Sequence, residues 1–171
     1  MYLKEKFLLA SLVQWMNEQY VGLYSSSTSF RAHEFEKHGT CTLEANQMST
    51  RELENHYFGQ IQKLNQKYDL ISALNKGGIY ASDDKSYTYQ EIVAALKNGF
   101  EDQSDYDVKI QCLTVDDTIY LGAIDLYLDL DFNLGKDLCA ASKSEMVTSF
   151  NMCSQSKPIF FPKFDWKQVS E

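Results

Sequence analysis

A chain of 171 residues can bury the core of one domain and is short for two. Its 44% hydrophobic and 23% charged residues give the balance of a globular protein, which excludes a disordered chain. The formal net charge of −8 repels polyanions at long range, which argues against a sequence-specific DNA-binding protein but allows a local site for one phosphate.

The opening of the chain can be interpreted in two ways. "MYLKEK" followed by "FLLASLV" imitates a signal peptide, but no small-residue cleavage pattern follows. Leu8, Leu12, Trp15 or Met16, and Tyr20 recur at helical spacing, which favours an amphipathic helix. No span of the sequence approaches the roughly 20 apolar residues of a membrane helix, so we expect no membrane partner.

Three further helices are predicted in the first 100 residues. Two of them open at a capping box, in which a hydroxyl residue and a glutamate three positions later satisfy free backbone N–H groups. The pairs that form these boxes are Ser49 with Glu52 and Thr88 with Glu91. Between them "YDLISALNKGG" predicts a short helix that ends at Gly77 and Gly78.

Beyond residue 105 the hydrophobic period changes to that of strands. "DVKIQC" alternates, and "AIDLYLDLDF" predicts a strand that buries one face, with the apolar residues Ile124, Leu126, Leu128 and Leu130. "IFFP" predicts a final short strand. Helices followed by strands indicate a single α+β domain over residues 1–171 with an antiparallel sheet.

The four cysteines Cys41, Cys112, Cys139 and Cys153 show no C-x-x-C spacing, which excludes a zinc ribbon. They are either sparse buried thiols or two disulfides of an oxidising compartment. Four cysteines allow three pairings, and the spacing does not select one.

The stretch "FRAHEFEKHGTC", residues 30–41, concentrates ionisable side chains. Its two histidines, His33 and His38, are five residues apart, or roughly 140° around a helix, whereas the zinc motif H-E-x-x-H places them about 40° apart. Lys37 adds a positive charge where a cation would lie. We therefore expect no metal.

Acid–base chemistry on a phosphate suits this stretch better. On a helix Glu34 shares a face with His38, and His33 shares one with Lys37. A neutral imidazole can remove a hydroxyl proton, while a lysine or a protonated imidazole stabilises charge on phosphorus and a carboxylate orients its neighbour. The alternative is a polar surface helix with incidental histidines.

Within this stretch, "HEFEKHGTC" resembles the second active-site signature of the ribonuclease T2 family, H-E-W-x-K-H-G-T-C. Eight of the nine positions agree when x is free, and the departure, Phe35 for tryptophan, keeps an aromatic ring. The similarity extends to "LVQWMNEQY", to "KGGIYASDDKSYTYQEIVAAL", to "IQC" and to "CSQSKPIFFP". It covers nearly the whole chain and implies a ribonuclease T2-like α+β fold.

The resemblance implies an endoribonuclease that cleaves RNA by attack of the ribose 2′-hydroxyl, leaves a 2′,3′-cyclic phosphate, and uses no metal or cofactor. His38 would be the general base, Glu34 and Lys37 would stabilise the transition state, and His33 would hold the phosphate. Such enzymes work in secretory, lysosomal or vacuolar spaces at acid pH, where two histidines can hold opposite protonation states.

One position of the family's substrate site also falls in this stretch. Phe30, three residues before His33, matches an aromatic that contacts a base, and such stacking supplies roughly 1–3 kcal/mol. Packing of Phe30 in the core is the alternative.

The family's first signature, of the type H-G-L-W-P, does not occur in this sequence, whose only His-Gly pair is His38-Gly39. That segment brings the catalytic acid, a central strand and much of the base-binding pocket. His56, the third histidine, is expected to be a surface residue of a helix rather than a replacement acid. Weak or absent activity is therefore expected without the missing histidine.

The resemblance also bears on the cysteines. Cys41 would lose its upstream partner, and Cys112 and Cys153 match a C-terminal disulfide. Cys139 matches half of a pair whose other half is Asp129 here. We expect one bridge, Cys112–Cys153, and two free thiols.

Two explanations of the missing signature remain open. In the first, the chain is the C-terminal portion of a longer ribonuclease and is active only with its N-terminal part, either in one chain or as a separate fragment. In the second, it is a natural short paralogue, a non-catalytic module that binds RNA or a protein partner.

Overall fold

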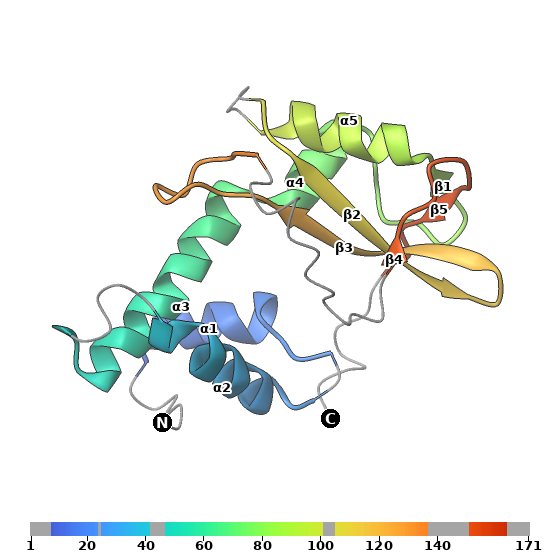
Figure 1. Cartoon of the computed structure of the whole chain (residues 1–171). Coiled ribbons are helices and arrows are strands. Elements are labelled where there is room, and N and C mark those ends of the chain that lie inside the picture. The colour runs from blue at the N-terminus through green and yellow to red at the C-terminus, as the bar shows by residue number, and fades with distance from the viewer. Residues whose placement is uncertain (1–7, 24, 42–46, 101–104, 137–150, 164–171) are drawn as a thin grey trace. The chain divides into compact units, whose positions relative to one another are not determined.

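The computed structural model describes residues 8–23, 25–41, 47–100, 105–136 and 151–163. The chain divides into two compact units, one of residues 1–67 with 165–171 and one of residues 68–164 (Figure 1). The prediction of a single domain over residues 1–171 stays a prediction.

The first unit contains the helices α1 (Ala10–Gln19), α2 (Ser27–Lys37) and α3 (Thr50–Lys67), with a 3₁₀ turn η2 (Gly39–Cys41) after α2. The predicted opening helix is confirmed, because Leu12 and Met16 of α1 are buried. All three helices contribute to one core, as expected when each buries an apolar stripe. Its buried members are Leu8, Leu12, Met16, Phe35, Leu53 and Phe58.

Both predicted capping boxes are present. At the start of α3 the Ser49 N–H donates to the Glu52 carboxylate at 2.9 Å, and the Glu52 N–H donates back to the Ser49 hydroxyl at 3.4 Å. The hydrogen bonds from the hydroxyl and N–H of Ser49 lower the pKa of Glu52. Thr88 and Glu91 form the same reciprocal pair before α5. Each box satisfies N–H groups that have no partner within the helix.

The second unit begins with two helices, α4 (Leu70–Lys76) and α5 (Tyr89–Gly99), which lie next to each other in Figure 1. α4 ends at Gly77, as predicted. The two helices approach closely, because a Cβ atom on Gly99 would lie 2.5 Å from the Cα of Ala73. This contact explains why glycine stands at the end of α5.

Within the described residues the sheet has the strand order β1-β5-β3-β2-β4. The strands are β1 (Ser86–Tyr87), β2 (Val108–Val115), β3 (Thr118–Leu126), β4 (Asn151–Met152) and β5 (Ile159–Phe160). Three of the pairings are antiparallel, whereas β3 and β5 pair in parallel. The predicted α+β class is confirmed, and the sheet, predicted to be antiparallel, also contains this one parallel pairing.

The predicted strand through Leu130 is too long. β3 ends at Leu126, and Leu130 is 96% exposed rather than buried. The chain turns because the Asp129 carboxylate accepts hydrogen bonds from the N–H groups of Asp131 and Asn133 at 2.9 and 2.8 Å. Such a local turn competes with continued strand pairing.

The predicted disulfide is confirmed. Cys112 of β2 bonds to Cys153 with a sulfur–sulfur distance of 2.03 Å. Cys41 is a free, exposed thiol, as expected, and Cys139 lies outside the described residues. Among the helices that the structure describes, none is long and apolar enough to cross a membrane.

Candidate active site

The helix α2 carries the ionisable stretch. It begins at Ser26, whose hydroxyl accepts a hydrogen bond from the Ser29 N–H at 3.3 Å, the usual role of serine at this position. All five predicted site residues lie on α2 or at its C-cap, and Arg31 and Phe35 are the buried side chains of this helix. Phe30, His33, Glu34 and Lys37 lie within the helix and His38 is its C-cap, and we call these five residues the α2 stripe.

Glu34 and His38 form the closest charged pair of the α2 stripe. His38 is the C-cap of α2, and its backbone N–H donates to the backbone carbonyl of Glu34 at 2.9 Å. The His38 Nε2 lies 3.9 Å from Glu34 Oε2, and the two side chains are 66% and 27% exposed. A carboxylate at this distance attracts a protonated imidazole and can orient the ring, while the ring stays accessible to a substrate.

The other members of the α2 stripe differ in exposure. His33 and Lys37 are exposed one helical turn apart, so both can reach the same anion in solvent. Phe30 is half-buried, with its ring centroid 5.0 Å from that of Tyr20. This partial packing is compatible with a role in the core and with contact to a base. The structure therefore places the five predicted residues on α2 and at its C-cap, with Glu34 beside His38, and their catalytic roles stay predictions.

Arg31 fixes α2 against α1. Its side chain is only 2% exposed. Its Nη2 donates to the Met16 carbonyl at 2.7 Å and its Nε to the Tyr20 carbonyl at 3.0 Å, and both terminal nitrogens donate to Asn17 Oδ1 at 3.1 Å. These carbonyls lie at the C-terminal end of α1, where the Met16 carbonyl also accepts the Tyr20 N–H. A single buried guanidinium thus ties the two helices together.

Two tyrosines lie near Glu34. The Tyr57 hydroxyl of α3 donates to the backbone carbonyl of Glu34 at 3.4 Å, and the Tyr20 hydroxyl hydrogen-bonds Tyr57. Burial, and then the nearby Glu34 carboxylate, raise the pKa of Tyr57. Burial and then the neighbouring Tyr57 and Glu34 raise the pKa of Tyr20, partly offset by Arg31. Both hydroxyls therefore stay protonated.

Sequence reasoning missed Arg31 and these tyrosine contacts. "R" in "FRAHEF" reads as a surface residue, and Tyr20 and Tyr57 were expected only as members of helix faces. The one local signal is that Arg31 precedes Phe35 by four residues and so shares its buried face. The tyrosines come from two other helices, so no spacing in the sequence relates them to Glu34.

Metal-binding residue types do not form a cluster in the described part of the chain. There, no group of three or more His, Cys, Asp or Glu side chains is close enough to bind one ion. The α2 stripe instead combines two imidazoles, one carboxylate and one ammonium on an exposed helix, the groups of general acid–base chemistry on an anion.

Comparison with known proteins now decides the family. The sequence model of the ribonuclease T2 family matches residues 2–153. The chain belongs to the ribonuclease T2 family. It is similar to a protein named ribonuclease T2 from Danio rerio, with 29% identity over 154 residues that cover 82% of this chain and 60% of that protein. Ribonuclease Oy from Magallana gigas is 30% identical over 158 residues, or 88% of this chain and 67% of that protein.

Solved structures give the same result for the fold. The crystal structure of human RNase T2 superposes with a TM-score of 0.72 and 27% identity, over 94% of this chain and 75% of that one. The structure of RNase NT in complex with 5′-AMP gives a TM-score of 0.69 at 21% identity, over 96% of this chain and 72% of that one. The chain spans 60% of the length of the Danio rerio relative and 67% of the Magallana gigas relative.

In this member of the T2 family the glycine of "KHGTC" is fixed by packing. A Cβ atom at Gly39 would lie 2.4 Å from the Phe35 ring and 3.0 Å from that of Tyr57. We therefore expect Gly39→Ala to lower the free energy of unfolding by about 1–3 kcal/mol, as overpacking does. Chemical denaturation would measure it.

Gly59 provides the matched control. It lies within α3, and a Cβ atom there would meet nothing within 4 Å. Gly59→Ala should therefore raise the free energy of unfolding by about 0.5–1 kcal/mol, because alanine favours a helix more than glycine. Equal effects of the two substitutions would contradict the packing explanation.

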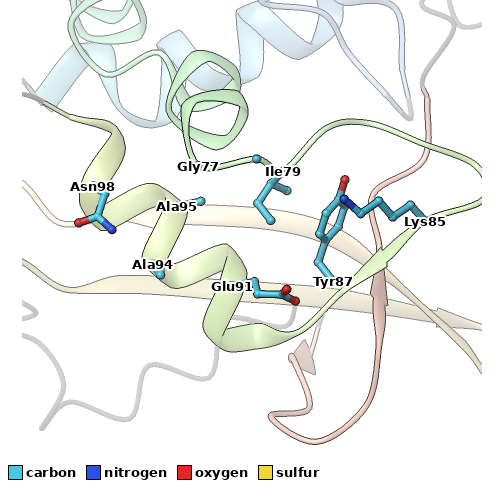
Figure 2. Close-up of a pocket in the computed structure, with 9 residues that line it drawn as sticks. Gly77, Ile79, Lys85, Tyr87, Glu91, Ala94, Ala95 and Asn98 are labelled. Atoms are coloured by element: carbon cyan, nitrogen blue, oxygen red, sulfur yellow. The ribbon is translucent and has the colours of Figure 1, made fainter.

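A pocket of about 240 Å³ lies elsewhere in this T2 family chain, in the second unit, and contains no predicted site residue. Figure 2 shows α5 on one side of it, with Glu91, Ala94, Ala95 and Asn98, and Ile79 and Tyr87 on the other. Several polar groups are engaged internally: Glu91 caps α5, and the Tyr87 hydroxyl bonds the backbone of Tyr80. Lys85 lies over the Tyr87 ring. We therefore assign no role in the proposed chemistry to this pocket.

Proposed function

We propose that this chain carries the active-site helix of an endoribonuclease, and that the α2 stripe acts on a phosphodiester of RNA. The observation that carries the proposal is the exposed His38 imidazole 3.9 Å from the Glu34 carboxylate, on the helix that holds "HEFEKHGTC". Membership of the ribonuclease T2 family supports RNA as the substrate.

In the proposed reaction His38 removes the proton of the ribose 2′-hydroxyl. The 2′-oxygen then bonds to phosphorus, the bond from phosphorus to the 5′-oxygen breaks, and a 2′,3′-cyclic phosphate remains. Lys37 and Glu34 stabilise the transition state, and His33 holds the phosphate. Phe30 contacts a base. This route needs a 2′-hydroxyl, so DNA is not a substrate.

The departing 5′-oxygen must receive a proton from an acid. The histidines of the sequence are His33, His38 and His56, and none stands in an H-G-L-W-P motif. We propose that a separate N-terminal fragment with such a motif supplies the acid. The 171 residues alone would then be weak or inactive, because general acid catalysis contributes about 10²–10⁴ in rate.

We also propose that the protein works in a secretory, lysosomal or vacuolar space. The disulfide between Cys112 and Cys153 supports this compartment, because such bonds persist in oxidising surroundings. The reaction itself uses no cofactor.

Two matched oligonucleotides test the proposal. One is an RNA strand, and the other carries a 2′-O-methyl group at every position. We expect cleavage of the RNA to a cyclic phosphate by the chain, alone or supplemented with a peptide that carries the first signature, and no cleavage of the methylated strand. Cleavage of both strands would contradict attack by the 2′-hydroxyl. Binding of RNA without cleavage under either condition would favour the non-catalytic module.

A further inference from the structure

The ring of Phe30 lies beside the residue that is proposed to hold the phosphate. Phe30 and His33 both belong to α2, and residues three positions apart on a helix are neighbours, with about 5–6 Å between their Cβ atoms. His33 is exposed, whereas Phe30 is half-buried. A base next to the bound phosphate can therefore contact Phe30 only while part of this ring stays at the surface.

The ring of Tyr20 supports the ring of Phe30. The two ring centroids are 5.0 Å apart, and the planes are tilted by 48°. The Tyr20 ring also lies 6.1 Å from that of Phe58, which is fully buried, and 6.1 Å from that of Trp15. Because protein interiors are close-packed, a ring with three such neighbours has little freedom to move. Tyr20 thus connects Phe30 to the core and fills space into which Phe30 would otherwise turn.

The backbone just after Tyr20 packs against Phe30 as well. Gly22 is buried, and a Cβ atom there would lie 3.0 Å from the Cβ of Phe30 and 2.5 Å from the carbonyl oxygen of Ser25. The place of Phe30 therefore depends on the path of the chain between α1 and α2.

Arg31 fixes the beginning of this path. Its Nε donates to the Tyr20 carbonyl at 3.0 Å, and its Nη2 donates to the Met16 carbonyl at 2.7 Å. Both terminal nitrogens donate to Asn17 Oδ1 at 3.1 Å. A guanidinium is a planar and rigid fork, so these hydrogen bonds set both the position and the direction of the chain at Tyr20. Arg31 is only 2% exposed, so it acts on the chain and does not contact a phosphate.

We propose that Arg31 and Tyr20 are positioning residues, which keep the ring of Phe30 at the surface for contact with a base of the RNA. This inference rests on the proposed function, in which Phe30 contacts a base. Arg31 holds the backbone at Tyr20, and the Tyr20 ring supports that of Phe30. Substitution of either residue should therefore weaken the recognition of a base and leave the contact with the phosphate backbone intact.

The first test measures base recognition without cleavage. The probes are a 2′-O-methyl RNA tetranucleotide and a strand of the same length whose riboses carry no base. Calorimetry gives both dissociation constants, and their ratio measures base recognition. We expect Phe30→Leu to reduce this ratio about tenfold, a typical loss for one stacked base. Arg31→Lys keeps the charge but lacks the planar fork, and it should reduce the ratio by a similar factor without changing the affinity for the strand that lacks bases.

Three variants accompany this measurement. Arg51→Lys, the same substitution at an exposed position of α3, is the matched control and should leave the ratio unchanged. Tyr20→Leu removes the aromatic ring and should act like Arg31→Lys, whereas the conservative Tyr20→Phe keeps the ring and should restore the ratio. If Arg31→Lys does not fold, Asn17→Ala replaces it, because this change removes one acceptor of the guanidinium and should reduce the ratio less strongly.

A double-mutant cycle separates positioning from general stability. In the Phe30→Leu background Arg31→Lys should reduce the ratio no further, because the ring that it positions is already lost. An unchanged ratio in Arg31→Lys, an additional loss in the Phe30→Leu background, or an equal loss of affinity for both strands would overturn the proposal.

The second test needs no RNA. In protein labelled with ¹³C in its phenylalanine rings, a soluble paramagnetic compound broadens the NMR signals of exposed rings, and Phe30→Leu assigns the signal of Phe30. We expect Arg31→Lys and Tyr20→Leu to reduce the broadening of this signal, because the ring turns toward the core. Unchanged broadening would overturn the proposal. If Phe30→Leu leaves the binding ratio unchanged, or the unaltered chain binds neither strand with or without the peptide that carries the first signature, the proposed base contact fails. The broadening then still decides whether Arg31 and Tyr20 position the ring.

Discussion

Replacing His38 with alanine is expected to lower kcat/KM for RNA cleavage by about 10²–10⁴, the usual contribution of a general base. The side chain is 66% exposed, so its loss should change the free energy of unfolding by no more than about 0.5 kcal/mol. A large loss of activity at constant stability would show that His38 acts in the reaction and not in folding. A coupled assay of cyclic phosphate release and a denaturation curve would measure both.

His56→Ala is the matched control for this prediction. His56 lies on α3, outside the α2 stripe, and has no proposed role in the reaction. We expect its replacement to leave RNA cleavage unchanged. If His56→Ala abolished cleavage while His38→Ala did not, the assignment of the general base to α2 would be wrong.

Replacing Phe35 with alanine is expected to lower the free energy of unfolding by about 3–5 kcal/mol, the cost of removing a buried phenyl ring. Phe35 is fully buried and its ring lies 5.8 Å from that of Tyr57 and 6.0 Å from that of Phe58. The cavity would open directly beneath the α2 stripe. Urea denaturation followed by circular dichroism would measure the loss.

Leu23→Ala serves as the control for Phe35→Ala. Leu23 is 51% exposed, and its truncation should change stability by less than about 0.5 kcal/mol. A similar small change for Phe35→Ala would contradict its place in the core. Phe35 stands where the signature of the T2 family has tryptophan, so the same core accepts a smaller ring at this position here.

Local features of the fold were predictable because local chemistry determines them. The boxes of Ser49 with Glu52 and Thr88 with Glu91 mark helix starts, since each needs only residues three positions apart. The length of the strand predicted through Leu130 was overestimated for a related reason. Alternation of apolar and polar residues continues past the point where the Asp129 carboxylate turns the backbone. Pairing with distant strands, including the parallel contact of β3 with β5, carries no such local signal.

The candidate site also has one part that the sequence predicts and another part that it does not. The α2 stripe follows from helical spacing within "FRAHEFEKHGTC" and from its resemblance to a known signature. The positions of the residues that pack against α2 do not follow from this spacing. Arg31 is buried because it satisfies carbonyls at the end of α1, and Tyr57 reaches Glu34 from α3. Such contacts depend on how helices pack, which spacing along one helix does not determine.

The bond between Cys112 and Cys153 has a consequence for the integrity of the chain. It joins positions 41 residues apart in the sequence, on β2 and just after β4. A protease that cut once anywhere from residue 113 to residue 152 would therefore release no piece, because both halves would stay covalently linked. A molecule nicked in this way would keep β5 tethered to the rest of its sheet.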